Sequence, residues 1–118
     1  MNANQLLDLV RQITDLDDPA VRERAADEVT DWTRSYTSAE AITLATVLSA
    51  TAARERNHTA LEAQLHALLE LTSTGHVEDT HMAHLREIDL AELPAELQGY
   101  ITDLHRAPVD ESGLLRAP

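Results

Sequence analysis

Two Glu-x-x-His pairs are the residues of this sequence whose types and spacing could bind a metal ion. Glu55 pairs in this way with His58, and Glu78 pairs with His81. Di-iron proteins built on helical bundles use two such pairs and two further glutamates, all pointing inward from long helices. Here Glu55 and His58 lie on either side of a predicted turn, so they do not share one helical face. We therefore predict no metal site and no cofactor, and interpret the histidines as parts of solvated helix faces.

The usual catalytic patterns are missing from the sequence. It contains no His-Glu-x-x-His motif, no nucleophile elbow and no cysteine. Three dispersed glycines, Gly75, Gly99 and Gly113, do not make a phosphate-binding loop. Adjacent acids such as Asp17 and Asp18 stand where a helix is predicted to begin, and carboxylates there interact favourably with the helix dipole. We therefore predict that the protein is not an enzyme.

The composition indicates one acidic domain. The chain has 118 residues, 21 acidic residues and nine basic ones, for a formal net charge of −12. This charge argues against binding to nucleic acid or to an anionic membrane, and favours a protein partner with a basic surface. The sequence shows no signal peptide and no long apolar run, so we expect a cytoplasmic protein. Abundant Ala and Arg without Lys, Phe or Cys suggest a GC-rich bacterial genome.

Apolar residues recur at helical spacing, which predicts an all-α fold. Asp18 and Pro19 are suited to the first positions of a helix, Thr37 and Glu40 form a capping-box pattern, and Asn57 is a further cap. The helices are expected at residues 4–15, 19–34, 38–54, 58–73, 77–87 and 95–105, with turns near 17–19, 55–58 and 89–94. The side chains expected to face the core are Leu6, Val10, Ile13, Leu16, Val21, Ala25, Val29, Trp32, Leu44, Val47, Leu48, Ala52, Leu61, Leu65, Leu68, Leu69, Leu97, Tyr100, Ile101 and Leu104.

The stretch "LLDLVRQITDLDDPAVRERAADEV" resembles a HEAT repeat, and a second unit follows at a spacing of 40 residues. Asp18, Pro19, Val21, Arg22 and Ala25 match that family's pattern, whereas the second unit lacks the proline and has Leu-Glu in place of Val-Arg. The resemblance implies three stacked helical hairpins in a short, curved α-solenoid whose second helices line a concave face. We expect this single domain to span residues 1–106 and a flexible tail to span 107–118.

A solenoid of this kind binds partners through an extended surface, so we expect a non-catalytic protein-binding module. Two rows of polar side chains are expected on the second helices, and a solvated surface is the alternative interpretation. Trp32 is interpreted either as the residue that closes the core of the first hairpin or as an exposed anchor for the partner. The predicted partner-binding residues are Glu23, Asp27, Asp31, Trp32, Glu62, His66 and Glu70.

Two functions are compatible with these features. Small acidic helical proteins of this type are similar to bacterial immunity proteins, which neutralise a secreted toxin, and an acidic face would complement the basic cleft of such a toxin. The alternative is a general scaffold or regulatory adaptor, or a module paired with a larger HEAT-like protein. The sequence does not distinguish these interpretations and leaves the oligomeric state open.

Overall fold

The computed structural model describes the backbone of residues 1–116 and the side chains of residues 1–105. Within this part of the chain the secondary structure is helical and contains no strand, so the predicted all-α class is confirmed. The elements in chain order are α1 (Ala3–Ile13), α2 (Pro19–Asp31), η1 (Thr33–Ser35), α3 (Ser38–Ala52), α4 (His58–Thr72), η2 (Asp79–Glu87), η3 (Leu90–Glu92) and α5 (Ala95–Arg116), where η marks a 3₁₀ helix.

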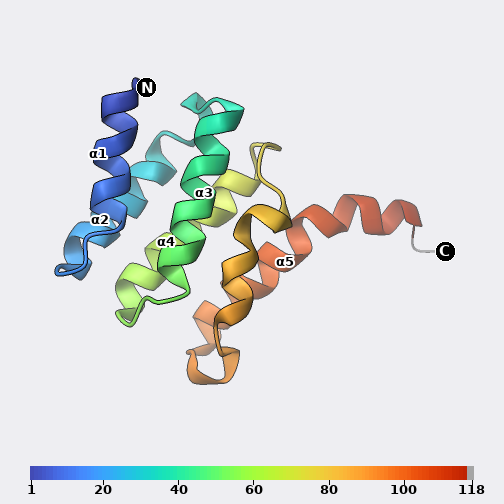
Figure 1. Cartoon of the computed structure of the whole chain (residues 1–118). Coiled ribbons are helices and arrows are strands. Elements are labelled where there is room, and N and C mark those ends of the chain that lie inside the picture. The colour runs from blue at the N-terminus through green and yellow to red at the C-terminus, as the bar shows by residue number, and fades with distance from the viewer. Residues whose placement is uncertain (117–118) are drawn as a thin grey trace.

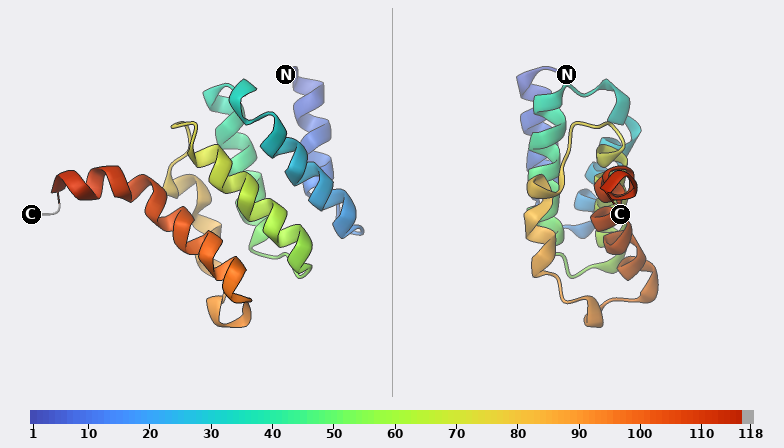
Figure 2. Two further views of the ribbon diagram at one scale, coloured as in Figure 1. Left: turned by 180° about the vertical axis from the view of Figure 1, so that it is seen from behind. Right: turned by 90° about the vertical axis from the view of Figure 1, so that its right-hand side faces the viewer.

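The helices lie in two layers, which stand next to each other in the right-hand view of Figure 2. One layer contains α1, α3 and η2, and the other contains α2, α4 and α5 (Figures 1 and 2). Within the second layer α4 lies between α2 and α5 and packs against both. Successive elements along the chain alternate between the layers, so the chain forms helical hairpins that stand side by side.

Three helix starts follow the predicted capping chemistry. The Asp18 carboxylate accepts a hydrogen bond from the backbone N–H of Ala20, directly before Pro19 at the first position of α2. Thr37 and Glu40 form a reciprocal capping box at α3. Asn57 caps α4 by accepting from the N–H of Ala60 at 2.9 Å. These bonds satisfy backbone donors that the first helical turn leaves free. The positions of the first two hairpins are therefore set by local sequence.

The third hairpin differs from the prediction. Gly75 has a φ angle of 83°, as expected for a glycine that follows the end of a helix. The segment after it, however, is the 3₁₀ helix η2 and not the α-helix expected at 77–87, with a kink at Met82 where φ is −121° and ψ is 26°. Met82 and Leu85 are buried, so this tighter helix places both side chains on the core.

Leucine and alanine side chains from both layers form one core, with Leu61, Leu65 and Leu68 fully buried as predicted. The prediction for Leu16 is wrong, because α1 ends at Ile13 and Leu16 stands in the turn with 94% of its surface exposed. Leu9, which was not predicted, fills the core with Ile13. The inward face of α1 is therefore defined by Leu9 and Ile13, and Val10 is only half-buried.

The next predictions concern the last helix, the C-terminal tail and a possible membrane span. The last helix was expected to stop near residue 105, whereas the backbone of α5 is helical to Arg116. The flexible tail predicted for 107–118 lies outside the residues whose side chains the structure describes, and its flexibility stays a prediction. No helix in the described part of the chain has both the length and the apolar character needed to cross a bilayer.

Candidate functional site

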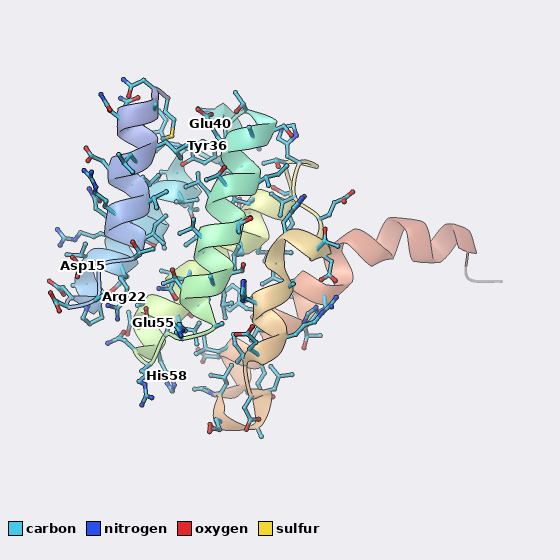
Figure 3. The ribbon with its side chains drawn as sticks, in the orientation of Figure 1. Asp15, Arg22, Tyr36, Glu40, Glu55 and His58 are labelled. Carbon is cyan, nitrogen blue, oxygen red and sulfur yellow. The ribbon has the colours of Figure 1, made fainter. Side chains whose placement is uncertain are left out.

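The turns of the first two hairpins are joined by a partly buried ion pair between Arg22 and Glu55, which we call the elbow ion pair. The Arg22 guanidinium donates from Nε to Oε1 of Glu55 at 2.7 Å and from Nη2 to Oε2 at 2.8 Å. Its Nη1 donates to the backbone carbonyl of Asp15 at 2.7 Å. Figure 3 shows Asp15, Arg22 and Glu55 gathered where the two turns meet. One side chain of α2 therefore fixes both turns.

The surroundings of Glu55 stabilise its charged form. Burial by itself would raise the pKa of Glu55, but hydrogen bonds from Arg22, from the Gln64 side chain at 2.7 Å and from the Asn57 backbone together lower it. The hydrogen bond to Glu55 in turn raises the pKa of Arg22. The carboxylate of Glu55 therefore has a structural role. Its hydrogen-bond partners are Arg22, Gln64 and the Asn57 backbone, and His58 is not among them.

The predicted acidic residues lie on two neighbouring helices. Asp27 and Asp31 are exposed on α2, and Glu62 is exposed on α4, which packs directly against α2. Glu23 on α2 and Glu70 on α4 are half-buried. We call this surface the acidic face and define it by six residues: Glu23, Asp27, Asp31, Glu62, His66 and Glu70. The two rows lie on helices that pack against each other, and that they form one binding surface stays a prediction.

His66 connects the acidic face to the next helix along the layer. Its ring lies 6.1 Å from the ring of Tyr100 on α5, with the two planes inclined by 39°. Its Nε2 lies 3.6 Å from an Oε2 of Glu70, one helical turn further along α4. His66 is therefore held between an aromatic ring and a carboxylate. Among the described side chains, it is the one predicted site residue whose ring contacts another aromatic ring.

Trp32 lies at the end of α2 next to Asp31, and 58% of its surface is exposed. The interpretation of Trp32 as the residue that closes the first hairpin is therefore wrong. Tyr36 is buried instead, and its hydroxyl donates to the carbonyl of Val29 at 3.3 Å. Because α2 ends at Asp31 and gives way to the 3₁₀ helix η1, the helical spacing that pointed Trp32 inward no longer applies beyond that residue.

Tyr36 is buried close to several acidic residues, which affect its pKa. Burial, followed by the charges of Glu28, Glu40 and Asp31, raises the pKa of Tyr36 to about 12. Its burial was not predicted, since the residue lies outside every expected helix. The sequence signal that could have revealed it is the hydrophobic residue directly before the capping box at Thr37, a common arrangement at helix starts.

A depression of about 500 Å³ joins the two acidic rows at one end. Asp31 and Glu70 both line it, one from each helix, together with Arg34 and His76. The predicted rows therefore do not run independently along the surface. Trp32 follows Asp31 in the chain, but it is not among the residues that line this depression.

The Glu-x-x-His pair at Glu78 has a structural role at the start of η2. The backbone N–H of Glu78 donates to Nδ1 of His81 at 2.9 Å, which occupies one of the nitrogens a metal would need. His84 forms a separate ion pair with Glu87. Among the side chains that the structure describes, no group of three or more His, Asp or Glu residues could hold a metal ion.

The comparisons with known proteins assign no family. No protein-family model, curated protein or solved structure matches this chain. A functional assignment therefore depends on the geometry of the chain itself.

Proposed function

We propose that the protein is a non-catalytic protein-binding module whose acidic face takes a partner with a basic surface. The observation that carries the proposal is the exposure of Trp32 directly after Asp31, at the C-terminal end of α2. Tryptophan is strongly enriched among the residues that dominate binding energy at protein interfaces. Since 58% of the surface of Trp32 is exposed, this side chain contributes little to the core. Trp32 would supply the apolar anchor of the interface.

The charges of the acidic face would determine which partners approach. Asp27, Asp31 and Glu62 carry no ion pair among the described side chains, so their charges act on a partner without internal compensation. Complementary charge speeds encounter and disfavours acidic competitors. A toxin domain with a basic cleft is a partner of this kind, and the cytoplasm is the location that the composition favours for an immunity protein that neutralises it.

The proposal includes a HEAT-like arrangement of the hairpins. Its support is that α2, α4 and α5, the second helices of successive hairpins, lie side by side in one layer. In a solenoid such helices form a continuous binding surface. The alternative, a general scaffold or regulatory adaptor, would use the same surface.

The first test replaces Trp32 by Ala and measures binding to a basic partner identified by pull-down from the native organism. We expect the complex to dissociate at least about tenfold faster, because the loss of a tryptophan anchor typically costs 2 kcal/mol or more. The melting temperature should stay near that of the wild type, since Trp32 is largely exposed.

Leu90→Ala is the matched control, because Leu90 is also an exposed apolar residue, at 41%, but lies in η3 away from the acidic face. The control should leave dissociation unchanged. Equal dissociation rates for the wild type and the Trp32 variant would refute the acidic face as the binding site.

A further inference from the structure

Helix α2 ends in acidic residues, although a helix C-terminus is where carboxylates are least favourable. The carbonyl groups at this end carry partial negative charge, so they attract cations and repel carboxylates. Glu28 and Asp31 nevertheless stand in the last turn of α2, and this turn contains no basic residue. Side chains three positions apart are neighbours on a helix surface, so the two like charges also repel each other. The last turn of α2 therefore lowers the stability of the helix unless a cation binds there.

The negative charge of this turn is not neutralised within the described part of the chain. Glu28 and Asp31 are exposed, and neither forms an ion pair with a described side chain. Residues 23–36 hold four acids and two bases, Arg24 and Arg34, for a formal net charge of −2. The excess of negative charge thus remains after both neighbouring arginines are counted.

The pKa of the buried Tyr36 hydroxyl reflects the same negative field. Burial is the main cause of its rise to about 12, and the charges of Glu28, Glu40 and Asp31 raise this pKa further. Among these charges Glu28 has the largest effect, although it is not one of the predicted partner-binding residues. The carboxylates therefore act together on one small region at the C-terminal end of α2.

Trp32 lies in the same region and supplies an exposed aromatic ring. Its backbone N–H donates to the carbonyl of Glu28 at 3.3 Å, so the helical path continues to Trp32. The side chains of Glu28 and Trp32 are then one turn apart on the same side of α2, and Asp31 directly precedes Trp32. We call Glu28, Asp31 and Trp32 together the tryptophan corner.

We propose that the tryptophan corner binds an arginine side chain of the basic partner. The plane of the guanidinium stacks on the indole of Trp32, its N–H groups donate to the Glu28 carboxylate, and Asp31 adds to the attraction. The inference rests on the proposed function, because it names the side chain through which the basic partner is recognised. It adds Glu28 to the binding site as a residue that determines specificity.

Arginine suits this corner better than lysine does. The faces of aromatic rings attract cations, and arginine is the cation that most often occupies them. Its planar group can lie on the ring while its edge offers paired donors to a carboxylate, whereas the lysine ammonium is a strongly hydrated point charge. A bound guanidinium would also offset the unfavourable charge at the end of α2.

The test uses the fluorescence of Trp32, which is the only tryptophan of the chain and so reports on the corner directly. The probes are short blocked peptides of equal length that carry two arginines, two lysines or two citrullines, citrulline being an uncharged analogue of arginine. At low salt the arginine peptide should change the emission of Trp32 in a saturable way. The lysine peptide should bind about threefold more weakly. The citrulline peptide should cause no saturable change.

Glu28→Gln should weaken binding of the arginine peptide roughly threefold, as expected for the loss of one exposed ion pair. Its melting temperature should not fall below that of the wild type, because the change removes a carboxylate from the negative end of α2. Glu92→Gln is the matched control, since Glu92 is an exposed glutamate of η3 without an ion pair among the described side chains. The control should bind the arginine peptide like the wild type.

Several results would overturn the inference. One is no saturable change at about 10 mM arginine peptide, a concentration at which even millimolar binding is nearly complete. Others are binding of the lysine or citrulline peptide as tight as that of the arginine peptide, or equal weakening by Glu28→Gln and Glu92→Gln. A lower melting temperature of Glu28→Gln would also overturn it, because the carboxylate would then support the fold.

The dissociation test with Trp32→Ala decides the proposed function separately. If Trp32→Ala releases the partner faster while the arginine and lysine peptides bind equally, the arginine assignment fails and the acidic face remains the binding site. If the partner dissociates from Trp32→Ala as slowly as from the wild type, both the proposed function and this inference fail.

Discussion

Arg22 and Glu55 lie 33 positions apart in the sequence, yet two parallel hydrogen bonds join the guanidinium to the carboxylate. The pair connects α2 of the first hairpin to the turn that begins the second helix of the next hairpin. A bidentate pair of this kind restricts both distance and orientation. The relative position of the two hairpins thus depends on a polar contact as well as on the leucine core.

Replacing Arg22 by Met should destabilise the fold by about 3 kcal/mol, because it leaves the Glu55 carboxylate buried without its main partner. The double variant Arg22→Met/Glu55→Leu should be more stable than the single variant, since it removes the unpaired charge. Chemical denaturation of both variants and of the wild type measures this. Arg24→Met, at an exposed position of the same helix, should change the free energy of unfolding by less than about 0.5 kcal/mol. A similar small loss for Arg22→Met would mean that the elbow ion pair contributes little.

Acid should weaken the fold partly through Glu55. Its pKa is lower in the folded state than the ordinary value of 4.5, so between these two values the unfolded chain binds more protons than the folded one. The stabilisation is therefore present above pH 4.5 and is lost as the pH falls below it towards the folded pKa. The difference in free energy of unfolding between the wild type and Glu55→Gln should shrink over this range. A difference that stays constant from neutral pH to strongly acidic pH would contradict the assignment.

The core prediction compares one substitution at a buried and an exposed site. Leu65→Ala should lower the free energy of unfolding by about 2–5 kcal/mol, because it removes a fully buried side chain and leaves a cavity. Leu16→Ala should change it by less than about 0.5 kcal/mol, since Leu16 lies in the solvent. Thermal or chemical denaturation measures both, and similar losses at the two positions would show that the faces are misassigned.

Charge reversal on the acidic face tests how a basic partner is recruited. Asp27→Arg together with Glu62→Arg should mainly slow association, and added salt should slow association of the wild type, because long-range attraction acts on encounter. The single variant Asp8→Arg is the control for the single variant Asp27→Arg, because both change the net charge equally and Asp8 is an exposed acid on α1 in the other layer. Stopped-flow association rates at low salt provide the measurement. Rates that fall equally with the Asp8 variant would indicate an effect of net charge and not of this face.

Helix starts were predictable because their causes are local. Asp18, Thr37 and Asn57 each bond to a backbone group within three residues, and Gly75 adopts a conformation that its lack of a side chain favours. The buried residues of α4 were equally predictable from the sequence, because its leucines keep helical spacing through the whole helix. Patterns that depend only on neighbouring residues thus identified most of the first two hairpins.

The remaining differences arise where tertiary contacts or helix ends decide the outcome. Leu16 and Trp32 were placed by extending a helical spacing beyond residues at which α1 and α2 end. The partner of Arg22 could not be read from a pattern, because Glu55 belongs to another hairpin.

The 3₁₀ helix η2 also has a consequence for the motions of the protein. Its nine residues form two short helical pieces that meet at the kink at Met82, so neither piece has the length of a regular helix. It stands at the edge of its layer, next to α3, and its weaker hydrogen bonds are shielded mainly by Met82 and Leu85. The amide protons of η2 should therefore exchange with solvent sooner than those of α3, so that the last hairpin opens while the first two remain closed.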